Sequence, residues 1–207
     1  MHWIGSGGPG YVDFLRHGQP EGGSRFRGRL DDPLSPLGWE QMWAAVDGVE
    51  GWDGIVSSPL TRCAAFAEQL AARRGLPLRL DERLREISFG DWEGQAVERL
   101  YREAEAELSR YWADPIANPP PNGEPLPEFR DRIAAVWADL MQEAEGRHLL
   151  VVAHGGVIRV LLSLVLEMPL AAVLRLEVPN AALSRVRVQA DINGRPSPSL
   201  MFHAGGP

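Results

Sequence analysis

Short apolar runs alternate with longer segments of helical periodicity along most of the chain. The apolar runs predict buried strands, and they occupy residues 11–15, 54–58, 76–80 and 148–153. The helical segments lie at about 35–49, from Pro59 onward, across 97–111, at 127–145 and directly after residue 156. Because strands and helices alternate, the sequence predicts a mainly parallel sheet that is covered by helices on both faces.

Two further strands are predicted toward the C-terminal end. Residues 182–190 alternate apolar and polar side chains, as an exposed edge strand does, and residues 198–204 are a candidate partner strand. The proline-rich segment 114–127 is too irregular for a helix or strand, and we interpret it as an insertion beside the site. Residues 1–10 are predicted to be a disordered or tag-like tail, which leaves one domain over residues 11–207.

Three of the predicted strands end in residues that can bind or attack an anion. The first strand is followed by Arg-His-Gly at 16–18, and the strand at 148–153 by His-Gly-Gly at 154–156. Arg62 lies in the first helical turn after another strand. Ligands of open α/β sheets bind at the carboxyl ends of strands, beside helix N-termini that attract anions. We therefore expect two histidines and two arginines to meet at one edge of the sheet.

This set of side chains suits a phosphoryl group. Arginines neutralise its oxygens, a neutral imidazole nitrogen can attack phosphorus, and a carboxylic acid can protonate the departing oxygen. The loop after the third strand offers four carboxyl groups, those of Glu82, Glu86, Asp91 and Glu93. The residue types alone leave open which histidine attacks and which carboxyl group donates the proton. A single histidine at a strand end is more often structural, and only the joint occurrence indicates a site.

Charge and composition narrow the classes of ligand. The chain has 21 basic and 28 acidic residues, a net charge of −7, which argues against a general nucleic-acid or membrane-surface binder. All the basic residues are arginine, which excludes Schiff-base chemistry and the lysine-dependent phosphate loop. Cys63, the single cysteine, falls on a predicted helix face, where we expect it to be a small buried hydrophobe. No metal-ligand spacing is recognisable, so we expect neither a metal nor a cofactor.

The sequence also carries expectations about compartment. The most apolar stretch, residues 157–166, is short and contains Arg159, so it predicts a core helix and not a membrane span. Residues 1–10 lack the basic and apolar regions of a signal peptide, and the low cysteine content fits a reducing environment. We therefore expect a cytoplasmic protein.

Four motifs carry a family resemblance: LRHG at 15–18, SSPLTRC at 57–63, REISFGDWEG at 85–94 and AHGG at 153–156. In this order they resemble the histidine phosphatase superfamily, which includes the cofactor-dependent phosphoglycerate mutases. Within it, RFRGRLDDPLSPLGWEQM, FGDWEG and PPNGEPLPEF are most similar to the alpha-ribazole phosphatase group. The resemblance implies a three-layer α/β/α sandwich with a mixed, mainly parallel central sheet, as in phosphoglycerate mutase.

The resemblance also implies a role for each residue of the predicted site. His17 would be the nucleophile that becomes phosphorylated. Arg16, Arg62 and His154 would hold the phosphoryl oxygens and stabilise the transition state. Glu86 would protonate the leaving alcohol and then take a proton from the water that attacks the phosphohistidine.

Further residues are predicted to contact the substrate. The backbone amide of Gly155 is an additional donor. Gln19 stands where family members often have glutamate, and Arg25 or Arg27 is a candidate for a phosphate contact that the loop otherwise lacks. The choice of substrate is expected to depend on residues above the phosphate pocket: Trp92, Tyr101, Tyr111, Trp112 and the segment 114–127. Helix packing is the favoured interpretation for Tyr101, and Trp112 is left open.

The activity implied by the resemblance is a metal-independent phosphomonoesterase that works through a phosphohistidine. Its expected substrate is alpha-ribazole 5'-phosphate, or a cobalamin 5'-phosphate in cobalamin biosynthesis. The alternative is a broad-specificity phosphatase of sugar phosphates or nucleotides, and a mutase or a non-catalytic binder of phosphorylated ligands is a further option. The expected partner is a small phosphorylated molecule, with no nucleic acid or membrane, and a homodimer is an option.

Overall fold

The structure is a computed structural model that describes residues 8–205. Within this range, six strands form one sheet with the order β3-β2-β4-β1-β5-β6. Their bounds are β1 Gly10–Arg16, β2 Gly54–Ser57, β3 Leu78–Leu80, β4 His148–Ala153, β5 Leu183–Ala190 and β6 Pro196–His203. The pairs β2–β3, β2–β4 and β1–β4 are parallel, whereas β1–β5 and β5–β6 are antiparallel. The sheet is therefore mixed and mainly parallel, as predicted.

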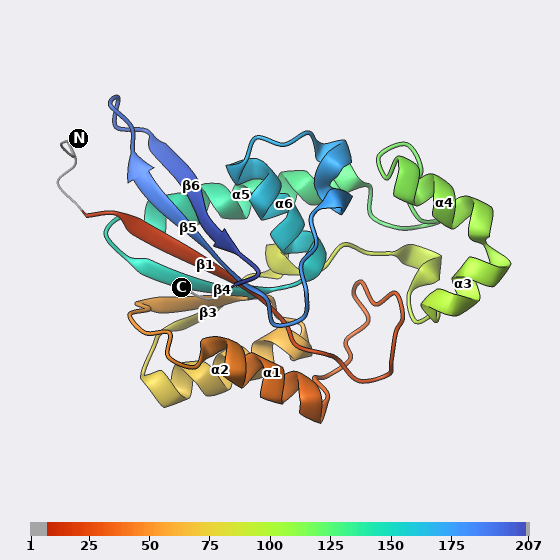
Figure 1. The fold of residues 1–207 in the computed structure, drawn as a ribbon, viewed down its shortest axis with the longest axis horizontal. Helices are drawn as coiled ribbons and strands as arrows, with labels where there is room; N and C mark the ends of the chain where they lie inside the picture. Colours follow the sequence, from red (N-terminus) through yellow and green to blue (C-terminus); the bar gives the residue numbers. More distant parts are fainter. Residues whose placement is uncertain (1–7, 206–207) are drawn as a thin grey trace.

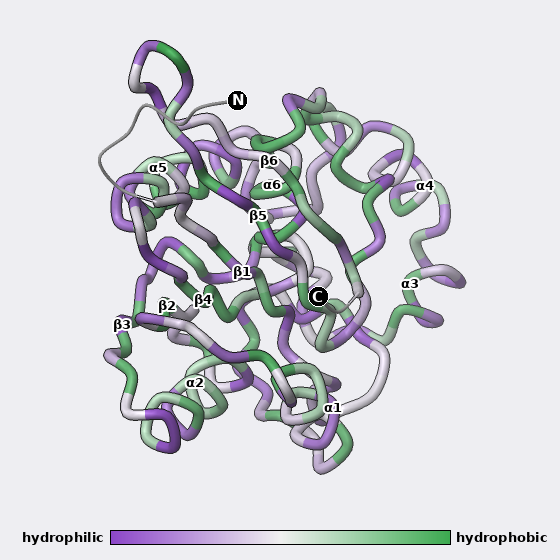
Figure 2. Tube along the Cα trace, turned by 60° about the vertical axis from the view of Figure 1, so that its left-hand side comes forward, coloured by the Kyte–Doolittle hydropathy of each residue, from purple (hydrophilic) through white to green (hydrophobic). Residues whose placement is uncertain are grey.

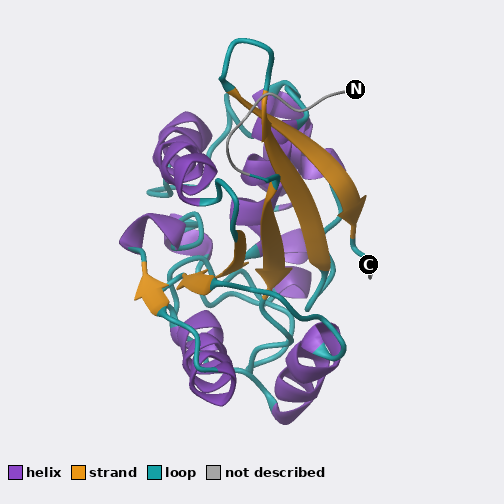
Figure 3. Cartoon of the chain, turned by 90° about the vertical axis from the view of Figure 1, so that its left-hand side faces the viewer, coloured by secondary structure: helices purple, strands orange, loops and turns teal. Residues whose placement is uncertain are grey.

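Helices cover both faces of this sheet (Figures 1 and 3). On one face lie α1 (Pro36–Val46) and α2 (Thr61–Arg74), and on the other lie α5 (Leu126–Glu143) and α6 (Gly155–Val165). Successive residues of a strand point to opposite faces, and two hydrophobic clusters divide the sheet accordingly, with Val151 in the α5–α6 cluster and Val152 in the α1–α2 cluster. The three-layer α/β/α architecture is thus confirmed.

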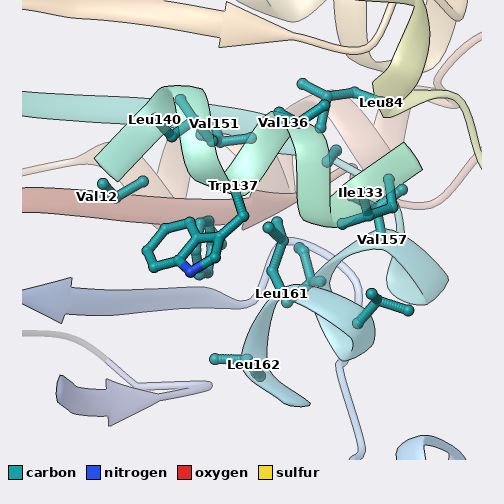
Figure 4. Close-up of a cluster of buried hydrophobic side chains, with 14 of the residues drawn as sticks. Val12, Leu84, Ile133, Val136, Trp137, Leu140, Val151, Val157, Leu161 and Leu162 are labelled. Atoms are coloured by element: carbon teal, nitrogen blue, oxygen red, sulfur yellow. The ribbon is translucent and has the colours of Figure 1, made fainter. Parts of the chain in front are cut away.

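The larger cluster shows why β4 reads as a continuous apolar run. Figure 4 shows Val136 and Trp137 of α5 and Val157 and Leu161 of α6 packed over the strands that include Val151. Because the other face of β4 is covered by α1 and α2, five of its six residues are buried. Residues 157–165 belong to the buried helix α6, as predicted, and no helix within residues 8–205 is long and apolar enough to cross a membrane.

The position predicted for residues 182–190 is wrong. The strand β5 lies between β1 and β6, and β6 forms the edge of the sheet. Apolar and polar residues do alternate along β5, as Figure 2 shows. The alternation reports that one face of the strand is packed on the core and the other is more exposed, and it does not report an unpaired edge.

The predicted helical stretch 97–111 is divided in two. The helices α3 (Val97–Glu103) and α4 (Glu105–Ala113) meet at Ala104, whose backbone (φ −138°, ψ 34°) leaves the helical region. Figure 1 shows both helices beside the loop that follows β1, away from the layers on the sheet. Short 3₁₀ segments complete the connections, at Glu82–Leu84, Gly90–Trp92 and Leu170–Arg175.

The remaining boundaries differ from the prediction by a few residues. Of the predicted tail, residues 1–7 lie outside the part of the chain that is described, and Gly10 already belongs to β1. The first helix ends at Val46 instead of residue 49, because the chain turns away at Asp47. Its start is fixed by Ser35, whose hydroxyl accepts the Gly38 amide hydrogen at 3.0 Å.

Candidate active site

The register of β1 against β4 brings the two histidine motifs together. Arg16, the last residue of β1, pairs with Ala153, the last residue of β4. The next residue of each strand is therefore a histidine at the same edge, and the rings of His17 and His154 lie 5.2 Å apart between centroids. The His17 amide donates to the Ala153 carbonyl at 3.0 Å, which extends the pairing by one residue.

His17 is held with one ring nitrogen available for attack. Its Nδ1 lies 2.8 Å from the carbonyl oxygen of Gly18, which can only accept, so Nδ1 carries the hydrogen in the neutral ring and Nε2 keeps its lone pair. The ring is 5% exposed. Burial, followed by the positive charges of Arg62 and Arg16, holds the pKa of His17 well below its usual value. A neutral imidazole with a free Nε2 is the form that a nucleophile requires.

His154 is fully buried at the N-cap of α6. Its Nε2 lies 2.7 Å from the hydroxyl oxygen of Ser58, which follows β2 and also accepts the Leu60 amide hydrogen at 3.3 Å. Burial, then the charges of Arg62 and His17, lowers the pKa of His154 well below its usual value. Cys63 is buried beside this ring, as predicted, and burial raises the pKa of its thiol to about 12.

Two arginines, the buried Arg62 and the partly buried Arg16, flank the histidines, and neither forms an ion pair with a carboxylate among residues 8–205. Arg62, in the first turn of α2, is 1% exposed and donates to the carbonyls of Leu30 and Gly28, each at 2.8 Å. Arg16 donates to the carbonyl of Val178. Burial lowers the pKa of Arg16 to about 10, which still leaves it charged at neutral pH. Carbonyl oxygens orient these guanidinium groups but do not neutralise them, and the charge of Glu86 raises the pKa of Arg16 without forming an ion pair with it.

The structure places one of the four candidate carboxyl groups at the first turn of α6, two residues after His154. Glu86 accepts the amide hydrogen of Gly156, in the first turn of α6, at 2.9 Å and that of Ile87 at 3.0 Å. A side chain on Gly156 would leave no room for this contact, since its Cβ would lie 2.3 Å from Glu86 Oε1. Arg132 of α5 fixes the loop by donating to the Glu86 carbonyl at 3.1 Å.

The other three carboxyl groups are engaged elsewhere. Glu82 pairs with Arg85 on the surface, and Asp91 accepts from Asn122. Glu93 accepts from the Phe89 amide at 2.9 Å and so shapes the same loop. The residue types alone left these four open, whereas the family resemblance implied Glu86, the one that the fold holds at the first turn of α6.

Two predicted substrate contacts on the loop after β1 have protein partners in the structure. Arg25 forms a two-pronged ion pair with Asp32, with atoms 2.7 and 3.1 Å apart, and Arg27 pairs with the same carboxylate at 3.0 Å. The Gln19 side chain is exposed, and its backbone accepts from Ser35 at 2.9 Å. Gly155 is the first residue of α6, directly beside Arg16, where a Cβ would lie 3.4 Å from Arg16 Nε.

An aromatic wall stands next to Glu86. A pocket there is lined by Glu86, Ile87, Phe89, Tyr111, Trp112, Leu126, Phe129, Gly156, Arg159, Val160, Val173 and Leu174. Trp112 lines this pocket and is 44% exposed, and its contact with the substrate stays a prediction. Trp92 is instead 4% exposed and packs behind Tyr111, with ring centroids 5.5 Å apart. The packing role predicted for Tyr101 is wrong, because this side chain is 48% exposed.

Three residues near the site were missed by sequence reasoning. Ser58 contacts His154, Gly156 receives Glu86, and Arg159 lines the pocket one helical turn after Gly155. The sequence did show Arg159 as a lone charge in an apolar helix, which is the feature that could have indicated a residue of the site. Among residues 8–205, no group of three or more His, Cys, Asp or Glu side chains is placed to hold a metal ion.

Residues 12–193 match the histidine phosphatase superfamily (branch 1). A glucosyl-3-phosphoglycerate phosphatase of Mycolicibacterium vanbaalenii is 37% identical over 167 residues, which cover 75% of this chain and 73% of the relative. The native structure of the mycobacterial glucosyl-3-phosphoglycerate phosphatase superposes with a TM-score of 0.84 at 30% identity, over 96% of this chain and 100% of that one.

A second solved structure, the alpha-ribazole phosphatase of Shigella flexneri, has a TM-score of 0.78 over 94% of this chain and 96% of that one. At 24% identity, this likeness is one of fold. The match across residues 12–193, together with the identity to full-length relatives, settles the family. The chain belongs to branch 1 of the histidine phosphatase superfamily and is a phosphoric monoester hydrolase.

Proposed function

We propose that the protein hydrolyses phosphate monoesters through a phosphohistidine formed on Nε2 of His17, without a metal ion. The observation that carries this proposal is the neutral, buried His17, whose Nε2 is free, between the buried Arg62 and the partly buried Arg16, neither of which forms an ion pair with a carboxylate in the described chain. Uncompensated buried charge of this kind is costly unless an anion binds there. A phosphoryl group supplies that anion, and the arginines supply the charge that stabilises its transition state.

In the first step, Nε2 of His17 attacks phosphorus and the ester bond to the leaving oxygen breaks. Glu86, in its protonated form, gives its proton to that oxygen, so that the alcohol leaves neutral. The Gly156 amide holds the carboxyl group at the first turn of α6, close to the two histidines. His154 and the amide of Gly155 are the proposed additional contacts to the phosphoryl oxygens.

In the second step, water attacks phosphorus and the bond between phosphorus and Nε2 breaks. Glu86 takes a proton from the attacking water and is thereby returned to its starting state. Inorganic phosphate leaves, and His17 is again neutral. A general acid and base of this kind contributes roughly 10²–10⁴-fold to the rate.

Trapping the intermediate tests this mechanism directly. Labelled phosphate ester, mixed with enzyme and quenched within milliseconds, should leave an acid-labile, alkali-stable label on the protein, and chelator should leave turnover unchanged. His17→Asn should abolish both the label and turnover, whereas His203→Asn, a histidine hydrogen-bonded to Ser184 outside the site, should preserve both. Wild-type turnover by His17→Asn, or complete loss of wild-type activity in chelator, would overturn the proposal.

Two substrates fit the proposed chemistry. Motifs of the sequence favour alpha-ribazole 5'-phosphate or a cobalamin 5'-phosphate, whose planar base could rest on an exposed ring such as Trp112. The relatives at 30% identity or above instead favour a phosphorylated hydroxy acid such as glucosyl-3-phosphoglycerate. Phosphate release from both compounds, with p-nitrophenyl phosphate as reference, separates them. Equal rates across this panel would support the alternative of a broad-specificity phosphatase.

A further inference from the structure

Arg159 is a charged residue beside the reaction centre that the proposed mechanism leaves unused. It lies on α6, and its Nε donates to the carbonyl oxygen of Leu176 at 2.8 Å. Within residues 8–205, no carboxylate lies at ion-pair distance from it. Ten other arginines of the described chain do have such partners: Arg25, Arg27, Arg29, Arg79, Arg83, Arg85, Arg99, Arg130, Arg132 and Arg185. Arg159 is therefore fixed by a carbonyl oxygen but is not neutralised.

The guanidinium of Arg159 lies next to that of Arg16. A Cβ built on Gly155 would lie 3.4 Å from Arg159 Nη1 and 3.4 Å from Arg16 Nε, so both groups flank the same point of the backbone. The neighbouring Gly156 holds Glu86. Arg159 and Glu86 thus lie against neighbouring glycines, Gly155 and Gly156, in the first turn of α6.

Arg159 also lines the pocket beside Glu86, which the leaving alcohol enters if Glu86 is the proton donor. The other side chains of the pocket are apolar or aromatic, apart from Glu86. The pocket has a cavity volume of about 60 Å³. A cavity of about 150 Å³ binds benzene, so this pocket has room for a few non-hydrogen atoms and not for a planar base. A short polar chain is the better fit, and anything larger must extend outward past the exposed Trp112.

The charges at the site also favour a polar group in this pocket. Both histidines are neutral because burial and the charges of Arg62 and Arg16 lower their pKa values. Among residues 8–205, Arg16, Arg62 and Arg159 all lack a carboxylate at ion-pair distance. Of these three arginines, Arg159 is the one that lines the pocket.

We propose that Arg159 binds a carboxylate on the alcohol portion of the substrate, which is then a phosphorylated hydroxy acid. This inference rests on the proposed function and chooses between its two substrates, because alpha-ribazole 5'-phosphate has no carboxylate. A guanidinium pairs with a carboxylate through two parallel hydrogen bonds, which gives both affinity and orientation. The acid group would fill the pocket, with the ester oxygen beside Glu86.

Matched pairs of small phosphate esters test the inference. 3-Phosphoglycerate and glycerol 3-phosphate differ in a carboxylate against a hydroxymethyl group, and phosphoserine and phosphoethanolamine differ by the carboxylate alone. We expect the wild-type kcat/KM to be roughly 10–100-fold higher for the carboxylate member, as charge-assisted hydrogen bonds allow. In Arg159→Gln, this ratio should fall to near one, mainly through KM, with a larger loss for the carboxylate esters than for p-nitrophenyl phosphate. Arg175→Gln, which removes an exposed arginine, should keep the wild-type ratio.

Binding provides a readout that does not need hydrolysis. The dissociation constants of 3-phosphoglycerate and glycerol 3-phosphate are measured by calorimetry on His17→Asn protein, with and without Arg159→Gln. Tighter binding of the carboxylate member that disappears in Arg159→Gln supports the inference, even if the phosphohistidine mechanism fails. A wild-type ratio near one would overturn the inference. So would an equal loss of kcat/KM for all esters, p-nitrophenyl phosphate included, in an Arg159→Gln protein with unchanged melting temperature.

Discussion

Ser58 is the residue on which the orientation of His154 depends. Its hydroxyl lies 2.7 Å from His154 Nε2, and both groups are fully buried. In Ser58→Ala, a buried ring nitrogen loses its partner, which costs about 1–3 kcal/mol. If His154 holds the phosphoryl group in the transition state, we expect kcat/KM to fall roughly 5–100-fold.

Ser58→Thr is the matched control, because threonine keeps the hydroxyl. We expect it to restore most of the activity, and steady-state kinetics with p-nitrophenyl phosphate provide the measurement for both variants. An alanine variant that is as active as the wild type would mean that the hydrogen bond is structural only. A threonine variant as impaired as alanine would point to packing beside Cys63 instead.

Gly156 has no side chain, and this leaves the room that the carboxyl group of Glu86 occupies. A methyl group there would lie 2.3 Å from Glu86 Oε1 and must displace the carboxyl group. We expect Gly156→Ala to lower kcat for glycerol 3-phosphate by roughly 10²-fold, the lower end of the contribution of a general acid. The release of nitrophenolate in the first turnover of p-nitrophenyl phosphate should slow much less, since nitrophenolate leaves without a proton and this step precedes the one in which Glu86 activates water.

The double variant Gly156→Ala, Glu86→Gln separates this explanation from a general loss of structure. If the glycine acts through Glu86, adding the alanine to Glu86→Gln should change kcat little further. Additive losses in the double variant would show that the alanine disturbs the site by another route.

At the level of elements, the strand ends explain why much of the site could be predicted. Arg-His-Gly and His-Gly-Gly each follow an apolar run, and the parallel register of Arg16 with Ala153 converts this pattern into adjacent histidines. The pairing of Arg25 with Asp32 was not predictable, because it depends on how an irregular loop folds back on itself. The residue types alone did not single out Glu86 among the four carboxyl groups. The family resemblance implied it, and in the structure the Gly156 amide holds its carboxyl group.

The polar group in the middle of β1 was also missed, because a strand pattern does not reveal its partners. Asp13 is fully buried and accepts from Trp52 at 2.8 Å and from Arg185 at 2.7 and 2.9 Å. His148 Nε2 lies 2.9 Å from the same carboxylate. Burial alone would raise the pKa of Asp13, but the hydrogen bonds from Arg185 and His148 outweigh it and lower the pKa. The network joins β1, β4 and β5 through one carboxylate.

Asp13→Asn should therefore be strongly destabilising. Removing one member of a buried ion pair leaves the other charge without compensation, at a cost of about 3–5 kcal/mol. Urea denaturation at pH 7 measures the free energy of unfolding. Glu103→Gln, which breaks the pair with Arg99 in which both side chains are more than half exposed, is the control and should change it by less than about 0.5 kcal/mol. A loss below about 1 kcal/mol in Asp13→Asn would contradict this role.

For the whole molecule, alternation of strands and helices was sufficient to predict a layered α/β/α fold. This alternation did not predict the order of the strands within the sheet, as the inner position of β5 shows. Local periodicity reports which face of a strand is buried, whereas the neighbours of a strand are decided by packing across the entire sheet. The exposure of Tyr101 has the same origin, since α3 covers less of the core than its periodicity suggested.

The two buried histidines also make the stability of the whole protein depend on pH. Both have pKa values well below 6.5 in the folded state, so they stay neutral where the unfolded chain binds protons. As the pH falls below about 6.5, the unfolded state takes up two more protons than the folded state, and the free energy of unfolding should decrease by up to about 2.7 kcal/mol per pH unit. Carboxylates with lowered pKa values, such as those of Asp13 and Glu124, lose their contribution only below about pH 4.5.

Urea denaturation between pH 7 and pH 5 isolates this effect from the carboxylates. The wild type should approach the full slope, and His17→Asn should have about half of it, because one of the two histidines is gone. Replacing His203 instead should leave the contribution of the two site histidines in place. A wild-type free energy of unfolding that stays constant from pH 7 to pH 5 would show that the folded site accepts protons as readily as the unfolded chain. The two rings would then be cationic below neutral pH, and His17 would lose the free nitrogen on which the proposed attack depends.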